Sequence, residues 1–275
     1  MRTTHLQAGW QSYVIGLAIL CLAGFPLWAL GEEVRTFTAE YVIAPDGGVS
    51  VRETIEYDFK NQDRHGIFRE LDTRHHDHGG SWLRERVVVY DLKTVTRAGS
   101  REPYTVSHDG DTVRIKIGDP DRTVSGLQTY VLTYDLSGAL SYDPVTEFYW
   151  NVTGDRWKVP IRAVVARVRA TGTAARAAEV ACYAGASGST QRCAAATNTA
   201  TETVFRESTL APGEELSIAQ AVASGSVAHV THEEWRLSLI FVPLAVLAAG
   251  LLGWLGYRFR THHRPEHAII ARYEP

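Results

Sequence analysis

Residues 48–59 read GVSVRETIEYDF and alternate apolar with polar side chains at a period of two. Such a period is typical of a β-strand with one buried and one solvated face. Strand signals recur on both sides of this stretch. They lie in TFTAEYVIA (36–44), RERVVVYDLKTV (84–95), DTVRIKIG (111–118), QTYVLTYDLSG (128–138), EFYWNVTG (147–154), VPIRAVVARVRA (159–170), TETVFRES (201–208) and EELSIAQAVAS (214–224). The sequence therefore predicts a chain made mainly of strands.

Turn residues separate the expected strands, for example at 45–48, 108–111 and 118–120. Because no helical pattern lies between the strands, the predicted fold class is all-β, an antiparallel β-sandwich. The length allows one large sandwich or two small ones, with a break near 137–144. Residues 172–200 contain few large apolar side chains, which predicts a surface excursion outside the core.

The C-terminal residues 237–257 read LSLIFVPLAVLAAGLLGWLGY and carry no charge. At about 1.5 Å per residue, a helix of this length crosses a hydrocarbon core of roughly 30 Å. The sequence therefore predicts a transmembrane helix. Arg258, Arg260 and Arg264 follow it, and the enrichment of basic residues on the inner side of membranes places the tail in the cytoplasm.

The N-terminal apolar run extends from Tyr13 to Leu30 and follows the basic residue Arg2. The small residues Ala29 and Gly31 suit a cut before Glu32, so the run resembles a secretory signal peptide, and the alternative is an uncleaved anchor. Either interpretation exports the middle of the chain. The predicted organisation is a signal peptide or N-terminal anchor (1–31), an extracytoplasmic β-sandwich domain (32–236), a transmembrane helix (237–257) and a short basic cytoplasmic tail (258–275).

The formal net charge of the whole chain is −3. Without Arg2 and the tail, where four Arg outnumber two Glu, residues 32–236 are left near −6, which is unlike a nucleic-acid-binding surface. Cys182 and Cys193 lie close together in the exported segment, and such a pair is predicted to form a disulfide. Two thiolates alone would leave a tetrahedral metal site half built, so we expect no metal and no cofactor.

Residues 64–71, RHGIFREL, form the first candidate segment. Gly66 between charged residues indicates a turn that needs glycine, followed by an Ile67-Phe68 pair with a buried character. Arg69 and Glu70 either form a partly buried pair or bind a ligand carboxylate through the guanidinium fork.

Residues 147–161, EFYWNVTGDRWKVPI, form the second candidate segment. Aromatic and polar residues concentrated in one hairpin-sized stretch are typical of sugar or peptide platforms, and the same residues also suit a sandwich core. Trp150, Asn151 and Trp157 are therefore candidate binding residues, together with Arg69 and Glu70.

Consecutive residues of an extended chain point to opposite sides, so His75, His76, Asp77 and His78 are predicted to form a solvated loop and not a metal site. The sequence contains no Gly-x-Ser-x-Gly, no His-Glu-x-x-His and no phosphate-binding glycine loop. Several exported carboxylates, including Glu53, Glu147 and Asp155, leave open an acid/base pair whose separation the sequence does not define. We predict no catalytic residue.

Several motifs in one order resemble the domain of unknown function 2207 family of bacterial predicted membrane proteins. They are residues 48–54 (GVSVRET), 65–70 (HGIFRE), 147–154 (EFYWNVTG), 157–161 (WKVPI), the pair Cys182 and Cys193, and the final residues 273–275 (YEP). The resemblance implies an exported β domain and a membrane helix, usually followed by further membrane helices and a cytoplasmic region. It implies no reaction. We expect either a short form or part of a longer membrane protein.

Topology and the missing catalytic motif together predict a membrane-anchored extracytoplasmic β domain that acts as a binding or interaction module at the cell envelope. Its expected partners are the lipid bilayer and an envelope protein, peptide or polymer, and no nucleic acid. One alternative is an envelope hydrolase that uses carboxylates or a metal at His75, His76 and His78. Another is a structural subunit or a truncated part of a larger membrane protein.

Overall fold

The computed structural model describes residues 31–75, 84–235 and 238–262. Within these residues the chain is mainly strands, as the sequence predicts. The largest sheet has eight strands in the order β14-β15-β12-β1-β2-β10-β6-β7. Its strands are β1 (Glu33–Ile43), β2 (Val49–Asp58), β6 (Val89–Arg97), β7 (Ser100–Arg101), β10 (Leu127–Ser137), β12 (Val164–Ala170), β14 (Ala195–Asn198) and β15 (Thr203–Glu207).

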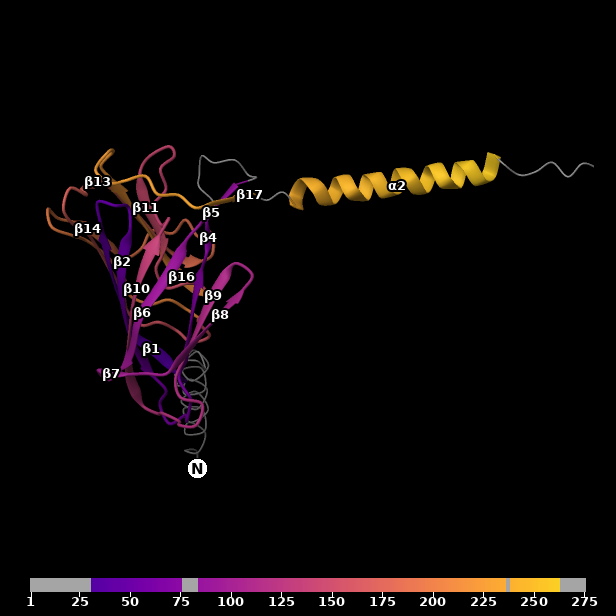
Figure 1. The fold of residues 1–275 in the computed structure, drawn as a ribbon. Helices are drawn as coiled ribbons and strands as arrows, with labels where there is room; N and C mark the ends of the chain where they lie inside the picture. The colour runs from indigo at the N-terminus through magenta and orange to yellow at the C-terminus, as the bar shows by residue number, and fades with distance from the viewer. Residues whose placement is uncertain (1–30, 76–83, 236–237, 263–275) are drawn as a thin grey trace, which may run out of the picture.

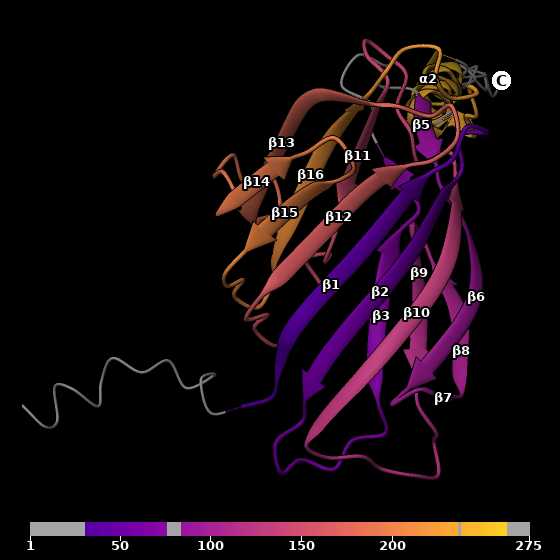
Figure 2. The ribbon, with the colours of Figure 1, turned by 90° about the vertical axis from the view of Figure 1, so that its left-hand side faces the viewer.

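Three-stranded sheets make up the rest of the described β structure. Their orders are β11-β16-β13, β3-β9-β8 and β17-β5-β4. The strands are β3 (Ile67–Asp72), β4 (Arg74–His75), β5 (Arg84–Val87), β8 (Tyr104–Asp109), β9 (Thr112–Ile117), β11 (Glu147–Asn151), β13 (Arg176–Ala186), β16 (Glu214–Val222) and β17 (Glu233–Trp235). The sheets containing β3 and β16 lie behind the eight-stranded sheet in Figure 2, which gives the two layers of a sandwich.

The expected all-β, mostly antiparallel architecture is confirmed (Figure 1). The exception among the described ladders is β12, which lies parallel to β1 with Phe37 opposite Val164. The strand before β12 in the chain is β11, which belongs to the opposite layer. The chain therefore crosses between layers before β12, and such a crossover can bring β12 alongside β1 in parallel, whereas a hairpin would make the pair antiparallel.

The alternation that predicts β2 is visible in its burial. Val49, Val51 and Ile55 are buried, whereas Arg52 is exposed. The buried side chains of the layers form one contiguous cluster, in which Tyr41 packs against Phe148. Burial of apolar area at about 25 cal/mol per Å² is the main favourable term in such a core.

Residues 172–200 are not a surface excursion throughout, and this prediction is wrong for β13. That strand pairs with β16, with Cys182 opposite Ile218, and Cys182 and Ala184 are buried. The segment is alanine-rich and has a weak strand propensity of its own, so pairing with its neighbour decides its conformation. The predicted disulfide between Cys182 and Cys193 is confirmed.

The described part of the chain contains one helix, α2 (Ser238–His262), that is long and apolar enough to cross a membrane. The candidate span is Ile240–Thr261, its mean hydropathy is 2.0, and none of it is buried. Figure 1 shows α2 standing apart from the sheets. Only residues 236–237 separate it from β17, which pairs with β5. The predicted signal or anchor segment and most of the predicted tail lie outside the described residues.

Candidate ligand-binding site

An ion pair lies at the centre of the sandwich. The Arg69 guanidinium on β3 donates two hydrogen bonds to the Glu53 carboxylate on β2, at 2.8 and 2.7 Å. The Tyr134 hydroxyl donates a third to Glu53 at 2.8 Å. Arg69 and Glu53 are fully buried, at 1% and 0% exposed. A bidentate guanidinium–carboxylate pair with further hydrogen bonds is the arrangement that makes buried charge tolerable.

Arg69 also fixes the turn that follows β11. Its terminal nitrogens donate to the carbonyl oxygens of Val152 at 2.8 Å and Thr153 at 2.7 Å. Arg69 therefore joins β3 to both layers of the sandwich. Of the two expected roles of this residue, ion pairing is the one in the structure, but its partner is Glu53 and not Glu70.

Further hydrogen bonds hold the turn. The Asn151 side-chain oxygen accepts from the Gly154 backbone N–H at 3.1 Å, and Trp157 Nε1 donates to the Thr153 carbonyl at 2.9 Å. The Thr153 hydroxyl accepts from Leu216 N at 3.1 Å. Gly154 has φ +74°, a conformation that glycine adopts without strain. The segment after β11 is thus fixed before any ligand arrives.

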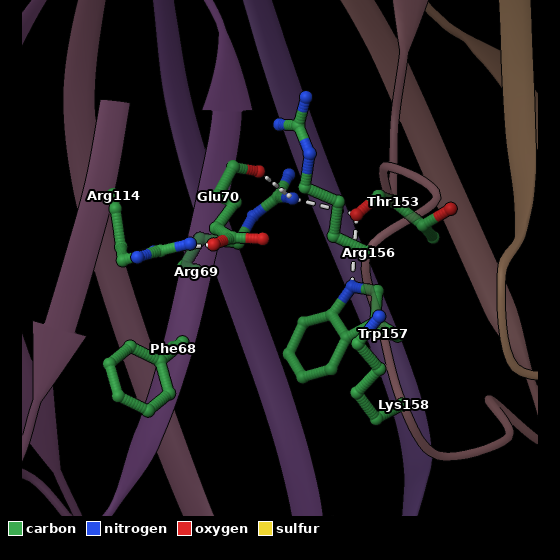
Figure 3. Close-up of a pocket in the computed structure, with 8 residues that line it drawn as sticks. All are labelled: Phe68, Arg69, Glu70, Arg114, Thr153, Arg156, Trp157 and Lys158. Atoms are coloured by element: carbon green, nitrogen blue, oxygen red, sulfur yellow. Dashed lines mark hydrogen bonds and ion pairs between the residues drawn. The ribbon is translucent and has the colours of Figure 1, made fainter. Parts of the chain in front are cut away.

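A groove lies between β3 and this fixed segment, and we call it the Phe68 groove (Figure 3). It consists of a hollow of about 300 Å³ and an adjoining hollow of about 590 Å³. The two share Phe68, Arg156, Trp157 and Lys158. The first is also lined by Arg69, Glu70, Arg114 and Thr153, and the second by Gly31, Glu32, Tyr57, Gln62, Arg64, Gly66, Ile67, Val159 and Pro160.

Two aromatic rings give the groove its apolar surface. Phe68 is 55% exposed, whereas its neighbour Ile67 is buried, so the expected burial of this pair is wrong for Phe68. Successive side chains of a strand point to opposite faces, which separates the two. The Trp157 ring is mostly buried and packs against Phe37 and against Tyr57, which lines the second hollow.

The charges around the groove are arranged mainly as pairs. Glu70 pairs with Arg114, and Arg64 pairs with Glu32 at 2.6 Å. Arg156 pairs with Asp72, just beyond the groove, at 2.8 Å. Lys158 is exposed and has no hydrogen bond or ion pair among the described residues. Partly exposed pairs of this kind add little stability and leave polar atoms available to a ligand.

Trp150 is the candidate residue that does not line the groove. It is 2% exposed, and its ring stacks with the rings of Phe148 and His75. Four of the five candidates therefore gather at one place: Arg69, Glu70 and Trp157 line the groove, and Asn151 holds its wall.

The predicted solvated loop is wrong for His75, which belongs to β4, is partly buried and stacks with Trp150. The rest of the predicted histidine loop lies outside the described residues. Among residues 31–75, 84–235 and 238–262, no group of three or more His, Cys, Asp or Glu side chains is placed to hold a metal ion.

Glu215 lies beside the fixed turn and accepts a hydrogen bond from the Asn151 amide. Burial raises the pKa of Glu215 above its ordinary value of 4.5, and the nearby Asp155 and Asp72 act in the same direction. The hydrogen bond from Asn151 opposes this shift.

Sequence reasoning missed Phe68 as an exposed platform, and it missed Arg114, Arg156 and Lys158 as lining residues. The period-two alternation in HGIFRE carried the signal for Phe68, because a buried Ile67 places the next side chain on the outer face. Arg114 had no such signal, since its position depends on the pairing of β9 with β3.

A model of the family described as "Predicted membrane protein (DUF2207) N-terminal domain" matches residues 33–221. The chain belongs to this family. The resemblance found in the sequence motifs is thereby confirmed. A curated relative of this DUF2207 domain is the uncharacterized protein YciQ of Escherichia coli (strain K12), 28% identical over 133 residues. That match covers 47% of this chain and 21% of YciQ, so it spans about a fifth of the relative's length.

Solved structures with some likeness to the DUF2207 chain are peptidases and hydrolases. The M1 zinc metallopeptidase from Deinococcus radiodurans is 14% identical with a TM-score of 0.37, over 68% of this chain and 42% of that one. Native leukotriene A4 hydrolase from Saccharomyces cerevisiae is 8% identical with a TM-score of 0.41, over 72% and 31%. Likeness at this level carries no conclusion about activity.

Proposed function

We propose that the chain is a membrane-anchored extracytoplasmic β domain that binds an envelope component in the Phe68 groove. The observation that carries this proposal is the groove itself. Its wall is held by buried hydrogen bonds from Arg69 and Trp157, while Phe68 presents a half-exposed ring to solvent. A fixed concave surface with an exposed aromatic and a few polar groups is the usual form of a ligand site.

Two features support the extracytoplasmic side for this domain. The disulfide between Cys182 and Cys193 is of a kind that persists in oxidising compartments. Arg258 and Arg260 lie at the C-terminal end of the candidate span Ile240–Thr261, and Arg264 follows it, which supports a cytoplasmic location for that end.

Site-specific photo-crosslinking tests the binding role. The full chain would carry a photoreactive amino acid in place of Phe68, and cells of the source organism would be irradiated. We expect a covalent adduct with an envelope component. Val145 provides a matched control, because it is also 55% exposed and lies in the loop before β11, outside the groove.

The comparison between the two positions decides the result. Adducts of equal yield at positions 68 and 145 would mean that the groove is not a specific site. The absence of any adduct at position 68 would contradict the proposed function.

A further inference from the structure

We propose that the Phe68 groove binds an unbranched chain of pyranose sugars. This assignment rests on the proposed function and names the ligand class of the same site. Its basis is the combination of an exposed ring, unused hydrogen-bonding atoms of both kinds and two adjoining hollows.

The aromatic surface is the first element. Phe68 lies on the outer face of β3, 55% exposed, at the part shared by the two hollows. The carbon-bound hydrogens of a pyranose form a flat apolar face, and such a face packs against an aromatic ring through dispersion and weak C–H contacts. At 55% exposed, the Phe68 side chain is open to such a contact.

The polar atoms around Phe68 are the second element. Arg114 donates its Nε–H to Glu70, and its terminal amino groups have no acceptor among the described residues. The second carboxylate oxygen of Glu70 accepts no hydrogen bond there either. Donors and acceptors therefore stand side by side, and each sugar hydroxyl both donates and accepts.

Charge balance separates a sugar chain from an anionic polymer. Arg64, Arg114 and Arg156 are each paired with a carboxylate, and Lys158 is the one lining cation without a partner in the described part of the chain. A polyanion site would need a surplus of cations. The groove instead offers nearly balanced charge within a domain near −6.

The geometry also leaves no room for a peptide strand beside Glu70 of β3. A Cβ added to Gly154 would lie 3.6 Å from the Glu70 carbonyl oxygen, so the fixed turn lies against that edge of the strand. An added strand would lie about 4.8 Å from β3 along its free edge, so none fits between Glu70 and the turn. The ligand has to occupy the open part of the groove near Phe68.

Binding of defined tetrasaccharides to the full-length protein in detergent micelles tests the assignment. The probes are chitotetraose, cellotetraose and maltotetraose, followed by calorimetry and saturation-transfer NMR. We expect at least one to bind at millimolar concentration or below, with saturation transfer to the ring-face protons of the sugar. Substitution Phe68→Ala should weaken that binding by about tenfold or more, as for an aromatic anchor.

Two variants and one condition sharpen the test. Phe68→Trp keeps a ring face and should retain binding, and Val145→Ala removes an equally exposed apolar side chain outside the groove and should change nothing. Affinity should change by less than about twofold when salt is raised, because no surplus charge is being neutralised.

Failure of the sugar assignment and failure of the proposed function give different results. If none of the tetrasaccharides binds but a photoreactive residue at position 68 still forms an envelope adduct, the binding role stands and the sugar assignment falls. An adduct that is a protein, or binding that weakens steeply with salt, overturns the assignment as well. Loss of both sugar binding and the adduct overturns both.

Discussion

A guanidinium taken out of water needs an acceptor for each of its five N–H groups. Arg69 finds all five in the core: both oxygens of Glu53 and the carbonyls of Glu70, Val152 and Thr153. Because every donor is satisfied, the residue fixes the relative position of three chain segments. The wall of the Phe68 groove is one of these segments.

Replacement of Arg69 by methionine should destabilise the protein by about 3–5 kcal/mol, because Glu53 would remain buried without its counter-charge. Arg69→Lys should also destabilise, since an ammonium has three donors and cannot reproduce the fork. Urea unfolding of the full-length protein in detergent, followed by tryptophan fluorescence, measures the effect.

Arg206 is a suitable control for Arg69. It lies exposed on β15, and its side chain has no hydrogen bond or ion pair among the described residues. Arg206→Met should therefore stay within about 0.5 kcal/mol of the unmodified protein. If Arg69→Met unfolded at the same urea concentration as Arg206→Met, the central role of the buried pair would be wrong.

Glu215 makes stability depend on pH in the opposite sense to a salt-bridged carboxylate. Its pKa is raised by burial above the ordinary 4.5, so the folded state holds this proton more tightly than the unfolded state. The stabilisation is complete below pH 4.5 and is lost as pH rises through the raised pKa. Glu215→Gln should therefore raise the melting temperature at pH 7 and have less effect near pH 4.

Melting curves of the Glu215→Gln variant and the unmodified protein across this pH range provide the measurement. Gln keeps an acceptor for the Asn151 amide, so the substitution changes charge and little else. An equal rise in melting temperature at pH 7 and pH 4, or a fall at pH 7, would contradict the expectation that burial disfavours the ionised form of Glu215.

At the residue scale, the sequence predicted which segments lie at the groove better than it predicted what each side chain does there. Motifs around Arg69 and Trp157 indicated the neighbourhood of the groove because they concentrate aromatic and charged residues within short stretches. Which of these side chains is buried depends on pairing across sheets. Glu53 is 16 positions from Arg69 in the sequence, and nothing local marks it as the partner.

Among the elements, β13 depends most on its surroundings. Within the described residues, β13 is an edge strand whose neighbour in the sheet is β16. The disulfide joins Cys182 on β13 to Cys193 in the segment that follows this strand. Cross-linking a loop of this size removes disorder from the unfolded chain and contributes about 2–3 kcal/mol.

The double substitution Cys182→Ser and Cys193→Ser should lower unfolding stability by about 2–3 kcal/mol. A reducing agent should lower the melting temperature of the unmodified protein and leave that of the double variant unchanged. If the reducing agent affected both proteins equally, the disulfide would not be the cause.

Element-scale prediction succeeded where alternation was strong and failed where it was weak. The buried pattern of β2 follows from its sequence alone. The strand β13 and the parallel contact of β12 with β1 do not, because both are set by which neighbour the backbone meets.

For the whole molecule, topology yields a direct test. Single cysteines would be introduced at Ser107, exposed on β8, and at Ala268 in the predicted tail, in a chain with Cys21 replaced by alanine. A membrane-impermeant maleimide should label position 107 in intact cells and position 268 only after permeabilisation. The reverse pattern would place the β domain in the cytoplasm.

The pairing of β17 with β5 has a mechanical consequence. Glu234 lies opposite Glu85 in this ladder, and Arg74 contacts both side chains, at 2.7 Å for Glu234 and 3.2 Å for Glu85. Only residues 236–237 then lead to α2. These contacts join β17 to β5 and β4 in one three-stranded sheet. A mechanical load applied through β17 would therefore be shared by three strands instead of acting on one.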